Sequence, residues 1–115
     1  MQRNQAIRVT LIDDHPIVRA GIKAILGNSP LFDVIDEADN GKEWLTQIEA
    51  LQPDYVLLDI QMPEMDGLSV AQEMQRKNTT TRAILLSQFI AHDTFIQIKT
   101  LPVVRGALLK HAVTH

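Results

Sequence analysis

Residues 55–59, Tyr-Val-Leu-Leu-Asp (YVLLD), carry the clearest indication of how this chain folds. Their apolar run is continuous rather than alternating, which is typical of a β-strand buried on both faces, and it ends in an aspartate. Residues 8–13 (RVTLID) and 83–86 (AILL) have the same apolar character. Such strands occur mainly in parallel sheets that helices cover on both sides, so the sequence predicts a sheet of that kind.

The segments between these runs carry apolar residues at helical spacing. Five predicted strands alternate with four helical segments, which is typical of an α/β fold, here a three-layer sandwich with helices on both faces of a parallel sheet. Asn40 and Glu43 form a capping-box-like start for the second helix. The predicted strands are residues 8–13, 32–38, 55–58, 83–86 and 106–109. The predicted helices are residues 16–26, 40–51, 68–74 and 93–101.

The composition indicates one ordinary globular domain: 115 residues, of which 45% are hydrophobic and 22% charged. The absence of cysteine excludes disulfide frameworks, zinc ribbons and thiol nucleophiles. A net charge of −3 and the lack of a Lys/Arg cluster argue against nucleic-acid binding by this domain itself. No stretch is long and apolar enough to cross a bilayer, and the polar start is no secretory signal. We therefore expect a cytoplasmic protein with no membrane partner.

Polar residues follow four of the predicted strands at their carboxyl ends, where ligands of parallel sheets bind. They are Asp13 and Asp14 at the end of the first strand, Asp59 after the third, Ser87 after the fourth and Lys110 after the fifth. Carboxylates gathered at one edge repel one another, because two charges about 4 Å apart cost about 4 kcal/mol at an effective dielectric of about 20. Either the pKa values of these carboxyl groups are raised or a cation is bound at this edge.

Oxygen ligands favour a hard divalent cation, and Mg²⁺ fits best. The ammonium of Lys110 and the hydroxyl of Ser87 beside that cation would suit a phosphoryl group. Because the predicted site contains no histidine or cysteine, zinc and copper are poor candidates. We expect no catalytic role for any of the four histidines, and interpret the first of them as a first-turn helix residue. They are His15, His92, His111 and His115.

Four stretches resemble the receiver (CheY-like) domain of bacterial two-component response regulators: residues 13–16 (DDHP), 57–67 (LLDIQMPEMDG), 84–87 (ILLS) and 106–110 (GALLK). Residues 13–26 (DDHPIVRAGIKAIL) resemble the NarL/FixJ subfamily, in which a LuxR-type helix-turn-helix follows the receiver. The resemblance extends over nearly the whole chain and implies the strand order 2-1-3-4-5. It also implies a signalling switch that a sensor histidine kinase phosphorylates and that acts on DNA only through an output domain.

The resemblance also implies which residues carry the reaction. Asp59 would be the phosphoacceptor, taking a phosphoryl group from the phosphohistidine of the kinase. Asp14 would bind Mg²⁺ directly and Asp13 mainly through water, while Asp59 and the backbone carbonyl of Gln61 would complete the protein ligands. The chain would be no enzyme beyond catalysing its own phosphorylation and dephosphorylation.

The resemblance further implies a switch made by Lys110 and Ser87. Lys110 would pair with Asp59 before transfer and with a phosphoryl oxygen afterwards. Ser87 would hydrogen-bond another phosphoryl oxygen and draw its loop inward. Ala107 departs from the pattern, since receivers usually carry tyrosine or phenylalanine there, and it leaves no ring for an aromatic switch.

The last part of the chain departs from the pattern as well. Pro102-Val103-Val104 replaces the usual glycine-containing turn, and the proline should end the helix at 93–101 early. Because only residues 111–115 follow Lys110, we expect a receiver over residues 1–115 whose final helix is truncated or missing, with no output domain. Apolar surface left on the last strand predicts a homodimer through the side formed by the 93–101 helix and that strand.

Two other functions remain open from the sequence. A Mg²⁺-dependent phosphohydrolase would also form an aspartyl phosphate, but such enzymes place a second aspartate where this chain has Gln61. Glutamine cannot exchange a proton, so turnover of phosphate esters should be slow. A phosphorylation-independent interaction module with the same fold is favoured by Ala107 and by the short tail.

Overall fold

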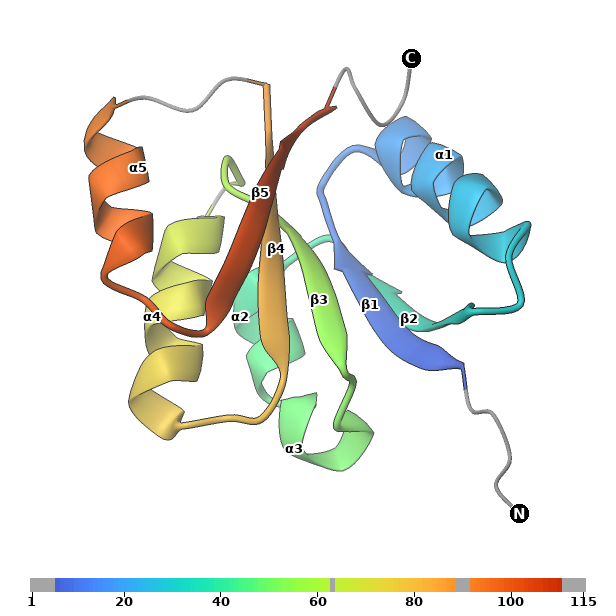
Figure 1. Cartoon of the computed structure of the whole chain (residues 1–115), viewed down its shortest axis with the longest axis horizontal. Coiled ribbons are helices and arrows are strands. Elements are labelled where there is room, and N and C mark those ends of the chain that lie inside the picture. The colour runs from blue at the N-terminus through green and yellow to red at the C-terminus, as the bar shows by residue number, and fades with distance from the viewer. Residues whose placement is uncertain (1–5, 63, 89–91, 111–115) are drawn as a thin grey trace.

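Parallel strands and helices alternate along the chain, as the sequence predicts (Figure 1). The structure, a computed structural model, describes residues 6–62, 64–88 and 92–110. The strands are β1 (Ile7–Ile12), β2 (Phe32–Ala38), β3 (Tyr55–Asp59), β4 (Arg82–Ser87) and β5 (Val104–Leu109). The helices are α1 (Pro16–Gly27), α2 (Gly41–Leu45), α3 (Ile48–Leu51), α4 (Gly67–Lys77) and α5 (His92–Lys99).

The five strands form one parallel sheet in the order β2-β1-β3-β4-β5, which confirms the expected topology. In the register of β1 and β3, Ile12 lies beside Leu58. The next residue of each strand therefore stands at the same edge of the sheet. This places Asp13 and Asp59 side by side, although they come from different βα units.

Alternation along the strands divides the apolar side chains between two faces, each with its own helices. Val56 and Leu58 of β3 belong to the larger core, together with Trp44 of α2 and Met74 of α4, and all four are at most 1% exposed. On the other face Leu11 of β1 packs in a smaller cluster with α1. The result is the predicted three-layer sandwich.

The predicted helix at 40–51 is wrong in one respect, because α2 and α3 are separate short helices. Asn40 caps α2 as predicted, accepting hydrogen bonds from the backbone N–H groups of Lys42 and Glu43. The helix then tightens: the Thr46 hydroxyl donates to the Glu43 carbonyl at 2.6 Å, and the Gln47 N–H donates to the Trp44 carbonyl at 2.8 Å. These three-residue closures end α2 before α3 begins.

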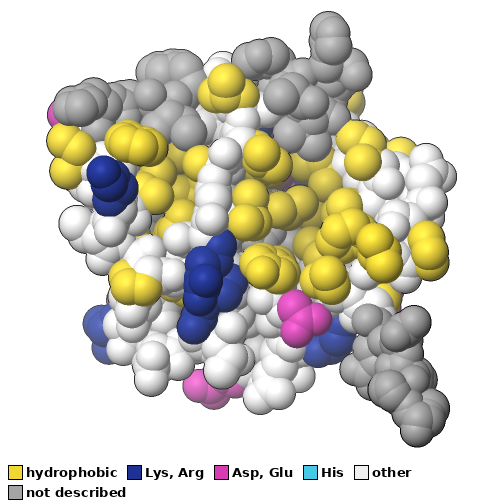
Figure 2. All heavy atoms as spheres, in the orientation of Figure 1, with side chains coloured by type: hydrophobic (Ala, Val, Ile, Leu, Met, Phe, Trp, Pro, Cys, Tyr) yellow, Lys and Arg dark blue, Asp and Glu magenta, His cyan; other side chains and the backbone are white. Residues whose placement is uncertain are grey.

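The expectation that β3 is buried on both faces is only half right. Val56 and Leu58 are fully buried, whereas Tyr55 and Leu57 on the α1 face are half-buried. Hydrophobic side chains gather on that face between α1 and β5 and line an open groove of about 550 Å³ (Figure 2). The groove is lined by Val9, Ile22, Ile25, Leu26, Phe32, Tyr55, Leu57, Ile84, Arg105, Gly106, Ala107 and Leu108.

The last strand begins earlier than predicted, at Val104 rather than Gly106. α5 ends at Lys99, before Pro102, as predicted from that proline. Any helix after Lys110 falls on residues 111–115, which lie outside the described residues, so the expected truncation of the final helix stays a prediction. None of the helices in the described part of the chain is long and apolar enough to span a membrane.

Candidate functional site

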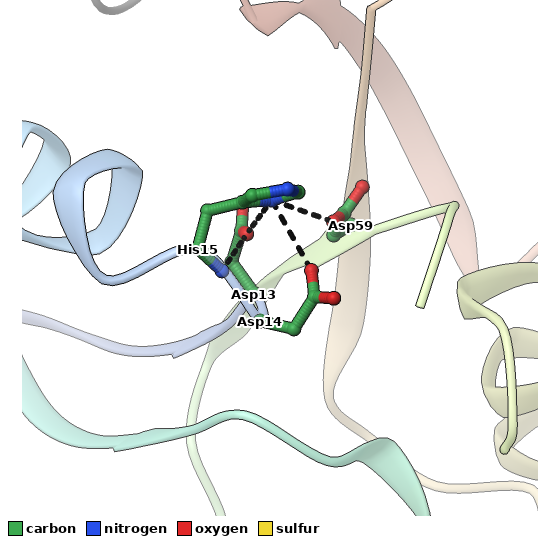
Figure 3. A group of neighbouring side chains, drawn as sticks. All are labelled: Asp13, Asp14, His15 and Asp59. Atoms are coloured by element: carbon green, nitrogen blue, oxygen red, sulfur yellow. Dashed lines mark hydrogen bonds and ion pairs between the residues drawn. The ribbon is translucent and has the colours of Figure 1, made fainter. Parts of the chain in front are cut away.

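Two buried carboxylates lie at the carboxyl ends of the central strands β1 and β3. Asp13 and Asp59 are each only 1% exposed, and Figure 3 shows them pointing toward the same space. The Asp13 N–H donates to the Ala38 carbonyl of β2 at 3.1 Å, which holds the end of β1 in the sheet. The Gln61 N–H donates to Asp59 Oδ1 at 3.1 Å.

Lys110 reaches these carboxylates from the end of β5, although β4 lies between β5 and β3. Its Nζ donates to Asp59 Oδ2 at 2.9 Å and lies 3.2 Å from Asp13 Oδ2. Its side chain is 9% exposed, so the ammonium forms both ion pairs largely away from water. A buried charge with two partners of opposite sign is held firmly in position.

The other predicted site residues stand around this pair. Asp14 follows Asp13 and is partly exposed, with one carboxylate oxygen buried and lacking a hydrogen bond within the described residues. Ser87 is buried at the end of β4, in register with Leu109 of β5. Gln61 is exposed and contacts the site through its backbone N–H. The structure therefore brings the predicted residues to one edge of the sheet.

His15 is the site residue whose place in the structure differs from the sequence prediction. It is the N-cap residue of α1 rather than a first-turn residue, and its side chain makes no capping hydrogen bond. Its Nδ1 instead lies 3.0 Å from Asp13 Oδ1 and 3.1 Å from Asp14 Oδ1 (Figure 3). The expectation of a site without histidine is wrong, and with it the reason for disfavouring zinc.

A local signal could have found His15. The residue directly follows the two site aspartates, Asp13 and Asp14, and directly precedes Pro16, the first residue of α1. Because the chain must turn from β1 into α1 within these residues, His15 cannot leave the edge of the sheet. Which way its ring points depends on the tertiary structure.

Burial and neighbouring charges change the pKa values of the two central groups. The pKa of the Asp59 carboxyl is raised, first because burial disfavours its charged form and then because the Asp13 carboxylate repels it; Lys110 partly opposes this shift. Burial alone would lower the pKa of Lys110, but the hydrogen bond and charge of Asp59, together with Asp13, outweigh it and raise that pKa. The surroundings therefore favour the charged form of Lys110 and disfavour the ionised form of Asp59.

The charges at this edge fit a divalent cation. Asp13, Asp14 and Asp59 contribute three carboxylates against the one ammonium of Lys110, which leaves two negative charges without a counter-charge among these groups. Asp13 Oδ2 is buried and, among the residues that the structure describes, its one charged partner is the ammonium of Lys110 at 3.2 Å, with no hydrogen bond that meets geometric criteria. One ligand atom from each of these carboxylates and from His15 lies within 4.8 Å of the others. Carboxylate oxygens at this spacing match the ligands that Mg²⁺ takes in proteins.

The start of α4 is fitted closely against the site. The Gly67 N–H donates to the Ile60 carbonyl at 2.8 Å, and the Asp66 side chain caps the helix by accepting from the Ser69 N–H at 2.8 Å. A Cβ atom at Gly67 would overlap the backbone carbonyl of Asp59. Glycine is needed here because the helix begins directly against the backbone of the site.

These features of the edge agree with the sequence pattern of the response regulator receiver domain, which matches residues 9–111. The chain belongs to this family. Receiver domains are signalling switches rather than enzymes in the usual sense, and they carry an acidic Mg²⁺-binding pocket at this edge. The family agrees with the resemblance in residues 13–16, 57–67, 84–87 and 106–110.

Several response regulators resemble this receiver domain. The nitrate/nitrite response regulator NarL of Escherichia coli K12 is 36% identical over 87 residues, which cover 76% of this chain and 40% of NarL. The transcriptional regulatory protein LiaR of Bacillus subtilis 168 is 37% identical over 105 residues, which cover 91% of this chain and 47% of LiaR. The chain thus spans less than half the length of these relatives.

Solved structures share the fold of this receiver domain. The signal receiver domain of NarL from Mycobacterium tuberculosis has a TM-score of 0.85 at 37% identity, covering 92% of this chain and 85% of that one. The response regulator domain of CheB from Thermotoga maritima has a TM-score of 0.78 at 27% identity, covering 91% and 78%. The NarL match supports the subfamily expected from residues 13–26.

Proposed function

We propose that this receiver domain is a phosphorylation-dependent switch in which Asp59 accepts a phosphoryl group from the phosphohistidine of a sensor histidine kinase in the cytoplasm. The observation that carries the proposal is the buried contact of Asp59 Oδ2 with Lys110 Nζ at 2.9 Å, beside the carboxylate of Asp13. A carboxylate is a weak nucleophile, and it reacts with phosphorus only where the negative charges around it are neutralised.

The reaction forms one P–O bond and breaks one P–N bond. An oxygen of Asp59 attacks the phosphorus in line, and the electron pair of the P–N bond returns to the kinase imidazole, which leaves neutral because its other nitrogen carries a proton. Lys110 neutralises Asp59 before the transfer and a phosphoryl oxygen after it. Ser87, at the end of the next strand, would donate its hydroxyl to another phosphoryl oxygen and draw the following loop inward.

The divalent cation fits this scheme through the residues already at the edge. Asp14 would hold Mg²⁺ directly and Asp13 mainly through water, together with Asp59 and the backbone carbonyl of Gln61. When bound, Mg²⁺ supplies positive charge to the phosphoryl oxygens and orients them for attack. The burial of Asp13 and Asp59 serves this purpose, because charge neutralisation is worth more where water is excluded.

Labelling by acetyl phosphate tests the proposal. With Mg²⁺ present, the wild-type chain should gain the mass of one phosphoryl group in intact-mass spectrometry, and EDTA should abolish the gain. Asp59→Asn should not be labelled. Asp39→Asn is the matched control, because Asp39 is an exposed aspartate just after β2, and it should be labelled like the wild type. Undiminished labelling of Asp59→Asn would falsify the assignment of the phosphoacceptor.

A phosphohydrolase working on external esters is the enzymatic rival. The residue two positions after Asp59 is Gln61, whose side chain cannot act as acid or base, and its exposed position does not change that chemistry. We expect no sustained turnover of p-nitrophenyl phosphate with Mg²⁺. Multiple turnovers that disappear in Asp59→Asn would support the enzyme instead of the switch.

We further propose that the switch controls a DNA-binding output domain in the full-length protein. The relatives named above as response regulators and transcriptional regulators support this, since the chain spans only part of their length. A module that no longer responds to phosphorylation is the other rival, and Ala107 of β5 favours it. Beryllofluoride with Mg²⁺ should perturb amide resonances of β4 and β5 in the wild type; an unchanged spectrum would favour the rival.

A homodimer through the β5–α5 side also remains a proposal. β5 is the edge strand of the described sheet, and exposed apolar side chains lie on both sides of it: Leu108, on the α1 face, is 45% exposed, whereas Phe95 and Ile96 of α5, on the other face, are 50% and 51% exposed. Edge strands with exposed apolar residues associate readily, and a second copy presents the same surface. Light scattering should show a dimer that Ile96→Lys weakens. Leu31→Lys, at an exposed leucine before the opposite edge strand, should leave it unchanged.

A further inference from the structure

His15 is held against the carboxylates by the backbone as well as by its ring. Its N–H donates to Asp13 Oδ1 at 2.8 Å, and Pro16 begins α1 immediately after it. The side chain is 53% exposed and makes no capping hydrogen bond, so no structural task of the helix accounts for where the ring lies. Figure 3 shows the ring above the space that Asp13, Asp14 and Asp59 face.

The distances around His15 Nδ1 are those of ligands that share a cation. Nδ1 lies 3.0 Å from Asp13 Oδ1, 3.1 Å from Asp14 Oδ1 and 3.8 Å from Asp59 Oδ2. Neighbouring ligands at about 2.1 Å from one ion stand about 3 Å apart in octahedral and slightly farther apart in tetrahedral coordination. Two of the three separations equal that value, and the third exceeds it by less than an ångström.

Hydrogen bonding cannot account for both close polar contacts of this nitrogen. An ionised carboxylate such as Asp13 can only accept, so Nδ1 would have to donate to it across their 3.0 Å contact. The ammonium of Lys110 can only donate, yet its Nζ lies 3.2 Å from the same Nδ1, which would then have to accept. One imidazole nitrogen does not do both. If Nδ1 instead gives its lone pair to a cation that it shares with the carboxylates, it need not donate to Asp13, and Lys110 donates to Asp59 and Asp13 rather than to the ring.

The two oxygens of Asp13 divide the positive charge between them. Oδ2 faces Lys110 at 3.2 Å, and Oδ1 faces the imidazole of His15 at 3.0 Å. Lys110 therefore stands on the Oδ2 side, whereas Oδ1 accepts the His15 N–H at 2.8 Å and has a second lone pair for a metal ion. A neutral imidazole would add a ligand on that side without adding charge.

We infer that His15 is a metal ligand of this site through Nδ1, and that it shifts the site's preference from Mg²⁺ toward borderline cations such as Co²⁺ and Zn²⁺. The inference rests on the metal site of the proposed function and adds a nitrogen donor to it. Carboxylates alone suit Mg²⁺, whereas imidazole suits the later transition metals. His15 is then the residue that sets metal selectivity.

Calorimetric titration of wild type, His15→Gln and His15→Ala with Co²⁺ and with Mg²⁺ tests the inference. Both variants should lose Co²⁺ affinity by about tenfold or more, a loss expected of a missing ligand, while Mg²⁺ affinity stays within about twofold. Asp14→Asn is the matched control at the neighbouring residue, and it should weaken both metals because it removes a charge. Equal losses for both metals in the His15 variants, or no loss for either, would overturn the inference.

Proton NMR of the Co²⁺-loaded protein gives a second readout. A coordinated imidazole shows an exchangeable N–H resonance shifted far outside the diamagnetic range, and His15→Gln should lack it. The variant keeps His92, His111 and His115, so a signal that survives comes from another histidine and contradicts the assignment.

Acetyl phosphate labelling separates this inference from the proposed function. If His15→Gln is labelled with Mg²⁺ but shows no change in metal preference, the selectivity role is wrong and the switch stands. If the wild type binds Co²⁺ through His15 but is not labelled at Asp59 with Mg²⁺, the metal ligand stands and the proposed function fails.

Discussion

The two faces of the sheet differ in how well helices cover them. On the face under α2, α3 and α4, the core residues Leu58 and Met74 have no exposed surface. On the α1 face, Leu57 and Ile84 are half-buried and line a groove of about 550 Å³. Leu57 and Leu58 are neighbours of the same type in one strand, so the difference lies in the helices that cover them. We expect stability to come mainly from the first face and association from the second.

Truncation of these two leucines should have the largest effect and tests the comparison directly. Leu58→Ala should lower the free energy of unfolding by about 2–5 kcal/mol, because it leaves a cavity in a packed core. Leu57→Ala should cost about half of that or less, because its site already opens into the groove. Urea denaturation measures both values. Equal losses would show that something covers the α1 face in solution.

Mg²⁺ should stabilise the folded protein by the same amount whichever face of the sheet carries a substitution. At a concentration of 100 times its dissociation constant, it should raise the free energy of unfolding by about 2.7 kcal/mol. Leu57→Ala and Leu58→Ala should gain the same increment as the wild type, because the ion acts on the strand ends and not on either core. Thermal unfolding with Mg²⁺ or EDTA measures the gain, which Asp13→Asn should lose.

As the pH is lowered, the stabilisation by Mg²⁺ should be lost at a higher pH than it would be if the ligand were an exposed aspartate. The pKa of Asp59 is raised above its usual 3.8, mainly by burial, so this ligand takes up a proton while an ordinary aspartate is still charged. Without Mg²⁺, in EDTA, the stability depends on pH in the opposite direction. As pH rises, the unfolded chain releases the Asp59 proton at a lower pH than the folded chain does. The contribution of Asp59 to stability is therefore lost as pH rises from 3.8 through its raised folded pKa. Melting curves across this range, with and without Mg²⁺, should therefore converge at low pH.

Substitution of one glycine on each face should give the smallest effects and shows how closely the helices of the two faces are packed. Gly67→Ala should destabilise by about 1–3 kcal/mol, because its Cβ would meet the backbone carbonyl of Asp59 and push α4 off the packed face. Gly27→Ala, at the end of α1, meets nothing within 4 Å and should stabilise by about 0.4–1 kcal/mol. The sign of the change in melting temperature distinguishes the two.

Most of the strands were predictable because their signals are local. Continuous apolar runs marked β3 and β4, and the polar residue that ends each run marked the site edge. The break between α2 and α3 was not predictable from apolar spacing, since Trp44 and Ile48 keep that spacing and are both buried. Hydrogen bonds of Thr46 and Gln47 to nearby carbonyls made the difference.

The candidate site was predictable as a set of residues but not as a set of contacts. Asp13, Asp59 and Lys110 follow apolar strands, and parallel strands bring their carboxyl ends together. His15 was misjudged because residue type and spacing do not say where an imidazole ring points. Its ring direction follows from the carboxylates and the ammonium that surround it in the folded chain.

Which chemical groups stand at the strand ends follows from residue order alone, because the succession of strands along the chain and the alternation of their side chains are local properties. Which atoms come into contact depends on how the strands assemble: Lys110 contacts Asp59 across 51 residues of sequence only because β4 lies between β3 and β5 at the right register. It also decided that one face of β3 is closed and the other open, since burial depends on the helix that packs above a side chain.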